Sequence, residues 1–259
     1  DTSAQCRRDS RDPSLPRGWQ TWAMVRFSYD QANIERFPNV VGGVIHADGV
    51  VNRPAPAELT AAFVAEQHAV RERIGQTPLS ELPTLAAWRG VFRGFDVNPT
   101  KYRSAAEALL RRLTKQGELP SINTLVDLAN LVSIRYALPV AVFDQRAIKG
   151  GTTVRLAHGG EVWADLGSST TEHPQAGEVI FADEDDIVSA RRWCWRQSRA
   201  SAARDDTSDI LVTVEGHHAV AADDVDRALR DLQSLLGTHA AAAAVSSDIL
   251  DAAQPSFSR

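Results

Sequence analysis

Leu119-Pro-Ser-Ile-Asn-Thr-Leu-Val-Asp-Leu-Ala-Asn130, followed closely by Leu138-Pro-Val-Ala-Val-Phe-Asp144, is the stretch that decides the fold. Apolar residues recur at helical spacing between Asn123 and Tyr136, which predicts an amphipathic helix. Leu138-Pro139 ends this helix, because the residue before a proline avoids helical backbone angles. The run Val140–Phe143 is β-branched and apolar, so a buried strand is expected directly after the helix.

Upstream of this stretch, the sequence predicts more helices. Ser104-Ala-Ala-Glu107 is a capping box, in which a serine side chain accepts a hydrogen bond from the free N–H of the glutamate. A helix is therefore expected to begin there. The spacing of apolar residues predicts another helix over Glu58–Ile74, with Gly75 as its stop. Further expected elements are a short helix over Tyr29–Arg36, a helix over Pro83–Val91, and an edge strand or loop over Phe92–Val97.

Downstream, short apolar runs between turn residues predict strands. Together with two runs near the beginning of the chain, the expected strands are Gln20–Arg26, Val40–Val51, Thr152–Leu156, Glu161–Trp163, Glu178–Ala182, Ile187–Ala190 and Asp209–Glu215. A last helix is expected over Val220–Leu236, closed by Gly237.

These elements predict an α+β fold: one domain over residues 19–237, with a mixed, mostly antiparallel sheet flanked by helices. Residues 1–18 are polar and contain prolines, so an unstructured lead-in is expected. Residues 238–259 begin with an alanine run and are rich in serine, which suggests a C-terminal tail. Both tails are expected to be dispensable for folding.

Composition excludes several classes of protein. The 259 residues contain no apolar run near the roughly 20 residues that cross a bilayer, so no membrane partner is expected. The first residues lack the apolar segment of a secretory signal, and a cytoplasmic location is the expectation. The net charge of −5 argues against nonspecific coating of nucleic acid. Two cysteines, Cys6 and Cys194, match no disulfide framework or zinc motif, and neither a metal nor another cofactor is expected.

The quoted motifs, with Asn98-Pro-Thr-Lys-Tyr-Arg-Ser104 before them and Arg191-Arg-Trp-Cys-Trp-Arg-Gln197 after them, give the chain a family resemblance. It resembles the B3/B4 module, the tRNA-binding and editing domain in the beta subunit of bacterial phenylalanyl-tRNA synthetase, which also occurs as a free-standing protein. The resemblance covers about residues 19–237. It implies a pocket in which a wrongly attached amino acid is hydrolysed from tRNA.

The resemblance also shows what this chain lacks. The asparagine of the family's Thr-Asn pair falls on Asn130, but the threonine falls on Ala129 and the editing histidine on Ala141. The editing glutamate falls on Thr213, and two small residues that open the pocket fall on Trp193 and Gln197. Hydrolysis of an ester needs a group that orients or deprotonates water, typically a histidine or a carboxylate. Ala141 and Thr213, at the aligned positions, can do neither. The resemblance thus implies either a smaller ligand at this place or no ligand there, and the catalytic residues stay unknown.

The Arg191–Gln197 segment resembles a signature of the free-standing relatives. If it is a strand, Arg192, Cys194 and Arg196 share one face, and the two guanidinium groups suit a carboxylate or phosphate. The substrate-binding residues are therefore expected to be Asn130, Arg192, Arg196, Gln197 and Trp193. An alternative for the arginines is pairing with Asp183, Asp185 or Glu178. We expect Glu178–Gln197 to form two adjacent strands, or a strand and a tight return, which brings Asp183 or Asp185 close to Arg191 or Arg192.

Other polar residues have plainer interpretations. His217-His218 is expected in an exposed loop, Cys194 as a buried apolar side chain, and His173 as a weak acid–base candidate beside Glu178. Asp127, Asn130 and Asp144 have two interpretations: they form the bottom of a polar pocket, or they hold the helix over Asn123–Tyr136 against the strand that follows it.

Three hypotheses for the function remain. The first is a tRNA-interacting protein that binds aminoacyl-tRNA and hydrolyses or intercepts the amino acid. The second is a small-molecule enzyme or binding module for an amino-acid-like carboxylate, built on the same fold. The third is a noncatalytic interaction domain. The sequence does not decide whether the protein is an enzyme or which oligomeric state it has.

Overall fold

The computed structural model describes residues 24–168 and 170–259. The expected lead-in over residues 1–18, and most of the expected strand over Gln20–Arg26, lie outside the described residues. The first described strand, β1, begins at Arg26 and ends at Tyr29.

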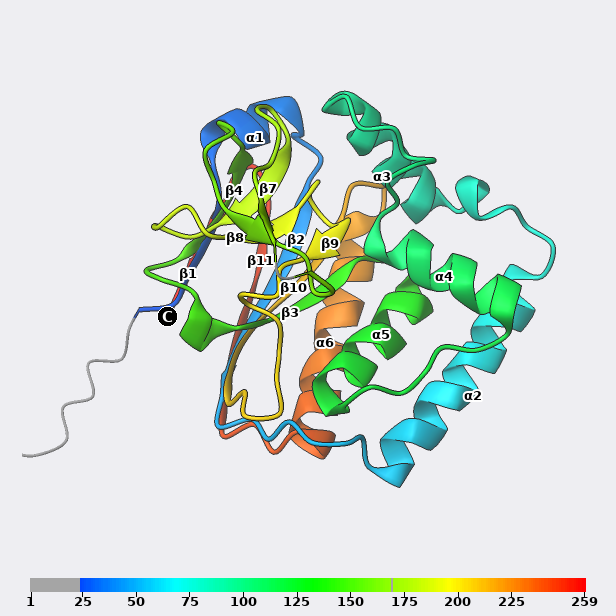
Figure 1. The fold of residues 1–259 in the computed structure, drawn as a ribbon. Coiled ribbons are helices and arrows are strands. Elements are labelled where there is room, and N and C mark those ends of the chain that lie inside the picture. Colours follow the sequence, from blue (N-terminus) through cyan, green and yellow to red (C-terminus); the bar gives the residue numbers. More distant parts are fainter. Residues whose placement is uncertain (1–23, 169) are drawn as a thin grey trace, which may run out of the picture.

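The strands form two main sheets (Figure 1). The four-stranded sheet has the order β11-β2-β10-β3 and is antiparallel throughout. The six-stranded sheet has the order β12-β1-β4-β7-β8-β9, and β1 and β4 are its parallel pair. A small third sheet pairs β5 with β6. The remaining strands are β2 (Val41–Asp48), β3 (Val140–Asp144), β4 (Thr152–Leu156), β5 (Trp163–Ala164), β6 (Thr171–Glu172), β7 (Val179–Ala182), β8 (Val188–Arg191), β9 (Arg196–Gln197), β10 (Asp209–Gly216), β11 (Ala244–Leu250) and β12 (Ser256–Ser258).

Six α-helices and two short 3₁₀ turns complete the described part of the chain. Their bounds are α1 (Gln31–Arg36), α2 (Ala57–Ile74), η1 (Leu79–Glu81), α3 (Pro83–Gly94), α4 (Ala105–Gln116), α5 (Thr124–Tyr136), η2 (Gln145–Ala147) and α6 (Ala221–His239). The α+β class with mixed, mostly antiparallel sheets flanked by helices confirms the prediction from the sequence. None of the helices in the described ranges has the length and apolarity of a membrane span.

The apolar core has two main layers. Helices α2, α4, α5 and α6 gather on one face of the four-stranded sheet (Figure 1), and their apolar side chains pack on Ile45, Val212 and Val214. The opposite face of that sheet, represented by Val44 and Leu211, packs against the six-stranded sheet. Because side chains alternate along a strand, successive residues of β10 reach different layers. The face that carries Leu211 also carries Thr213 and Glu215.

Local sequence signals fix several helix starts. The Ser104 hydroxyl accepts the N–H of Glu107 at 3.2 Å at the start of α4, as the capping box predicts. The Asn123 side chain accepts the N–H of Val126 at 3.0 Å at the start of α5. The helix α5 and the strand β3 that follows it therefore begin where the sequence predicts.

The expected C-terminal tail is wrong for most of its length. Residues 244–250 form β11, which pairs with β2, and residues 256–258 form β12, which pairs with β1. β11 is an edge strand whose residues are mostly half-exposed, so it lacks the alternation of a buried strand. Helix α6 also runs past Gly237 to His239, because that glycine lies in the last turn instead of after it.

Two further expectations need correction. Phe92, expected in an edge strand or loop, is buried within α3, which continues to Gly94. The segment Arg191–Gln197 is a tight return, not one strand: β8 ends at Arg191 and pairs with β9 across a turn. Arg192 and Trp193 occupy positive φ angles of 45° and 58° inside this turn. The expected alternation of faces along the segment therefore does not hold.

Candidate functional site

A pocket of about 80 Å³ opens where the start of α4, β3, β10 and the β8–β9 turn meet. Apolar groups form most of its wall, including Phe181 and Val140. Its lining residues are Ala105, Pro139, Val140, Ala141, Phe181, Ala190, Trp193, Cys194, Trp195, Arg196, Gln197, Thr213 and Glu215. The pocket therefore contains the two positions, Ala141 and Thr213, at which the family resemblance places the editing histidine and glutamate.

Glu215 is the ionisable carboxyl group of this pocket. It lies two residues after Thr213 on β10 and shares its face of the strand, and it is 2% exposed. Its Oε1 accepts the hydroxyl of Tyr29 at 2.7 Å and the indole Nε1–H of Trp193 at 2.9 Å. Burial raises the pKa of Glu215 to about 7, while these two hydrogen bonds act to lower it. A carboxyl group with this pKa exchanges protons near neutral pH.

Aromatic rings pack around Trp193, which donates a hydrogen bond to Glu215. The ring of Trp193 is fully buried and meets Phe37 and Trp88 edge-on, with centroids 5.2 Å and 5.4 Å away. His217 packs edge-on against Trp193 at 4.9 Å. The sequence suggested an exposed loop for His217-His218; instead, burial lowers the pKa of His217 to about 3, so its ring is neutral.

Three of the five expected substrate-binding residues line the pocket, and two do not. Trp193, Arg196 and Gln197 belong to its wall. The Gln197 amide donates to the carbonyl of Val142, and Arg196 pairs with Asp165. Asn130, which is partly exposed on α5, and Arg192, which is 8% exposed in the β8–β9 turn, are not among the lining residues.

The arginine pairings differ from the expectation. Arg191 binds Glu178 at 2.8 Å and Glu172 at 2.9 Å, and both Arg191 and Glu178 are buried. Asp183 instead accepts the backbone N–H groups of its own turn, and Asp185 pairs with Lys149 at 2.9 Å. The proposed contact of Asp183 or Asp185 with Arg191 or Arg192 is therefore wrong. Within the β7–β8 turn Asp183 bonds the local backbone, while the buried Arg191 pairs with Glu178, which directly precedes the neighbouring strand β7.

Cys194 also lines the pocket, and burial raises the pKa of its thiol well above the usual value. A thiol in this environment stays protonated and is a poor nucleophile.

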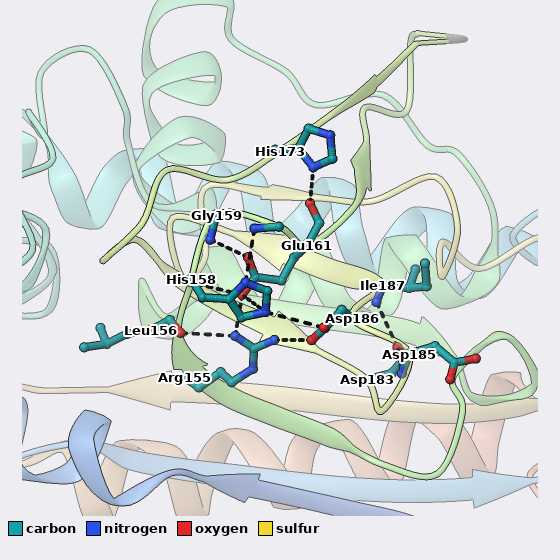
Figure 2. Close-up of polar contacts among 11 residues, drawn as sticks. Arg155, Leu156, His158, Gly159, Glu161, His173, Asp183, Asp185, Asp186 and Ile187 are labelled. Atoms are coloured by element: carbon teal, nitrogen blue, oxygen red, sulfur yellow. Dashed lines mark hydrogen bonds and ion pairs between the residues drawn. The ribbon is translucent and has the colours of Figure 1, made fainter.

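His158, Glu161 and Asp186 form a cluster of metal-ligand type (Figure 2), and none of them lines this pocket. The imidazole Nε2 of His158 is 3.4 Å from carboxylate oxygens of both Glu161 and Asp186. The guanidinium of Arg155 already bonds both carboxylates. Although burial acts to raise the pKa of Glu161, hydrogen bonds from the His158 N–H and from Arg155 lower it to about 2. The positive charge that a metal would bring is thus supplied by Arg155.

Figure 2 also places His173, the weak acid–base candidate. Its Nδ1 is 2.8 Å from the carbonyl oxygen of Glu161, so its ring is fixed to the backbone. Glu178, expected as its partner, is bonded to Arg191.

Comparisons with known proteins identify related sequences. The B3/4 domain family profile matches residues 87–241. The phenylalanine–tRNA ligase beta subunit of Bradyrhizobium diazoefficiens is 36% identical over 116 residues, 45% of this chain and 14% of the relative. The same subunit of Chromobacterium violaceum is 32% identical over 95 residues, 37% of this chain and 12% of the relative. This chain therefore matches only about one seventh of the length of these curated relatives.

Among solved structures, an N-terminal fragment of the phenylalanyl-tRNA synthetase beta-subunit from Pyrococcus horikoshii aligns with a TM-score of 0.43. The alignment has 11% sequence identity and covers 87% of this chain and 50% of that chain. The family match spans more than half of the 259 residues and includes the start of α4, β3, β10 and the β8–β9 turn, which meet at the pocket. The chain belongs to the B3/4 domain family.

Proposed function

We propose that this B3/4 domain is a hydrolase of aminoacyl-tRNA: it binds the charged end of a tRNA and hydrolyses the ester of a small amino acid. The observation that carries the proposal is Glu215, a buried carboxyl group with a pKa of about 7 in a pocket of about 80 Å³. General bases work best when their pKa lies near the working pH. This activity would place the protein in the cytoplasm, where tRNA is charged.

Glu215 can supply the chemistry that Ala141 and Thr213 lack. Its Oε1 is held by Tyr29 and Trp193, and no donor to Oε2 occurs among the described residues, so Oε2 can accept a water. In the proposed step, Oε2 takes a proton from this water as the water oxygen bonds to the ester carbonyl carbon. The carbon–oxygen bond to the ribose then breaks, and the proton passes from Glu215 to the leaving ribose oxygen.

The pocket volume restricts the amino acid. A cavity of roughly 150 Å³ holds one benzene ring. A pocket of about 80 Å³ has no room for the side chain of phenylalanine. Trp193 fills a position where the family resemblance implies a small residue. We therefore infer that the substrate carries a small side chain, of the size of alanine or serine.

A second candidate function uses the same pocket for a free amino acid. Glu215 and Arg196 both line it, and together they offer a carboxyl group for an ammonium and a guanidinium for a carboxylate. In that case the pocket binds a small zwitterion without hydrolysis. If the protein binds neither aminoacyl-tRNA nor a free amino acid, a noncatalytic interaction domain is the remaining function.

A deacylation assay separates these candidates. We would incubate the protein with tRNAs charged with alanine, serine or phenylalanine, and compare wild type with Glu215→Gln, which keeps the side-chain shape but cannot accept a proton. The matched control is Glu66→Gln, because Glu66 is a partly buried glutamate on α2 away from the pocket.

The proposal expects hydrolysis of the small aminoacyl esters, little hydrolysis of the phenylalanyl ester, and a loss of about 100-fold or more in Glu215→Gln alone. Equal rates in wild type and Glu215→Gln would contradict it. Calorimetric binding of free alanine without any hydrolysis would favour the second candidate.

A further inference from the structure

Five side chains beside the pocket form a cation–aromatic ladder: Lys101, Tyr102, Arg192, Trp195 and Arg196. The guanidinium carbon of Arg192 lies 4.0 Å from the ring centroid of Tyr102 and 4.5 Å from that of Trp195. Lys101 and Arg196 extend the ladder, at 5.0 Å from Tyr102 and 4.8 Å from Trp195 respectively. Each contact places a cation over a ring, within the range of about 6 Å of a cation–π interaction.

The ladder fixes Arg192 and leaves its hydrogen-bonding edge available. The residue is only 8% exposed, yet its guanidinium donates no hydrogen bond to any acceptor in the described ranges. The one carboxylate oxygen within ion-pair distance there, Glu178 Oε2, is 3.8 Å away, and Glu178 already binds Arg191 in a two-pronged contact. The Arg192 side chain is 10% exposed and its guanidinium makes no hydrogen bond within the described residues, so an anionic ligand that accepts from it would bind favourably.

The position of Arg192 relates it to the pocket. Trp195 and Arg196 belong to both the ladder and the pocket wall. The chain also holds Arg192 at a positive φ of 45°, a backbone conformation that costs free energy for a residue other than glycine. The turn thus presents a planar guanidinium next to the rim where a ligand would enter.

We propose that Arg192, held between Tyr102 and Trp195, binds a backbone phosphate in the single-stranded 3′ end of an RNA whose terminal group occupies the Glu215 pocket. This inference rests on the proposed function and names the part of the substrate that lies outside the pocket. A guanidinium matches two phosphate oxygens with two parallel N–H donors. Aromatic rings interleaved with cations are typical of surfaces that bind single-stranded nucleic acid.

The charges around the ladder suit a polyanion. Arg103 follows Tyr102 directly; its buried Nε donates no hydrogen bond to the described residues and lies 3.8 Å from Oε1 of Glu107. Arg103 lines a wide groove together with Arg89, Arg111 and Lys115, in which Glu107 is the acidic residue. The nearby carboxylates are already paired: Asp165 with Arg196, and Glu178 and Glu172 with Arg191. An RNA strand that leaves the pocket over Arg192 would continue toward this basic groove.

A pair of RNA hairpins tests the inference. One has a short single-stranded 3′ extension, and the other has the same duplex with a blunt end. We would measure the affinity of both for wild type, Arg192→Lys and Tyr102→Leu at one fixed salt concentration, after thermal melting confirms that each variant folds. The control is Arg227→Lys, because Arg227 also lies over a tyrosine ring, that of Tyr136 at 6.0 Å, but on α6.

Wild type should bind the extended hairpin more tightly than the blunt one. Arg192→Lys keeps the charge but loses the planar donor pair, so its affinity for the extended hairpin should fall about tenfold. Tyr102→Leu should cause a loss in the same direction, and Arg227→Lys should cause none. Equal wild-type affinity for both hairpins, or unchanged binding in Arg192→Lys, would overturn the inference.

Hydrolysis of alanine methyl ester, which carries no RNA, distinguishes failure of this inference from failure of the proposed function. If hydrolysis depends on Glu215 but RNA affinity is unchanged in Arg192→Lys, the phosphate contact is wrong and the proposed hydrolase stands. RNA binding that depends on Arg192 without any ester hydrolysis would retain the phosphate contact and reject the hydrolase.

Discussion

At the scale of single residues, Glu215 combines a stability cost with a chemical use. Its carboxyl group is buried between Tyr29, Trp193 and an apolar pocket wall, where an ionised carboxylate is poorly solvated. The raised pKa means that the folded protein holds a proton which the unfolded chain releases more readily. A buried ionisable group that opposes folding at neutral pH is typical of functional sites.

Glu215 should therefore make stability depend on pH. Its pKa rises from 4.5 in the exposed state to about 7 in the folded protein. The contribution to stability is fully present below pH 4.5 and is lost as the pH rises through 7, by up to about 3 kcal/mol. Glu215→Gln removes this dependence, so we expect its melting temperature relative to wild type to rise between pH 5 and pH 8. A constant difference at both pH values would contradict the assignment.

The sequence did not predict this residue, although it contained a signal for it. The resemblance pointed to Thr213, and the alternation of side chains along a strand places Glu215 on the same face. A lone glutamate at the end of an apolar strand is usually exposed. Its burial depends on Tyr29 and Trp193, which come from distant parts of the chain. Such long-range closure has no local sequence pattern.

Among the helices and strands, the start of α5 shows how one buried carboxylate ties a loop to the helix that follows it. Asp127 is fully buried, and its Oδ1 accepts the N–H of Ile122 at 2.8 Å while its Oδ2 accepts the hydroxyl of Ser121. These contacts tie the loop before the helix to its first turn. They explain why Asp127 braces the helix and does not reach the pocket.

Asp127→Ala should lower the free energy of unfolding by about 1–3 kcal/mol, because it removes two hydrogen bonds to a buried carboxylate. The measurement is denaturant unfolding, with Asp226→Ala on the exposed face of α6 as the control. A loss no larger than that of the control would mean that the loop does not depend on this carboxylate.

Local signals predicted the helices better than the β8–β9 turn. The Ser104 and Asn123 caps act within three residues, so the sequence contains both partners of each hydrogen bond. The turn requires positive φ angles at Arg192 and Trp193, which are uncommon in residues other than glycine. The period-two pattern of that segment predicted one strand, whereas tertiary packing of Trp193 on Phe37 and Trp88 favours the turn.

In the molecule as a whole, the last two strands form an edge of each main sheet. β11 pairs with β2 along the four-stranded sheet, and β12 pairs with β1 in the six-stranded sheet, where Phe257 is buried. The sequence did not predict these strands, because the alanine run and the half-exposed residues of β11 lack the alternation of apolar and polar residues that indicates a strand. The C-terminal segment thus belongs to the folded core.

A chain that ends at residue 243 should lose cooperative melting, because it exposes the edge of β2 and leaves a cavity at Phe257. Calorimetry of this truncation, beside the full chain and the single substitution Val245→Ala at an exposed site, checks the prediction. A truncated chain that melts cooperatively at the temperature of the full chain would show that both strands are dispensable.

If Glu215 is the base of a small-substrate hydrolase, the deacylation rate should follow the ionisation of its carboxyl group. We would measure single-turnover hydrolysis of alanyl-tRNA from pH 5.5 to pH 8.5, corrected for spontaneous hydrolysis. The account predicts a rate that rises with pH and levels off above an apparent pKa near 7, the value that burial gives Glu215, and no such step in Glu215→Gln. A rate that follows only the spontaneous reaction, or a step that persists in Glu215→Gln, would contradict it.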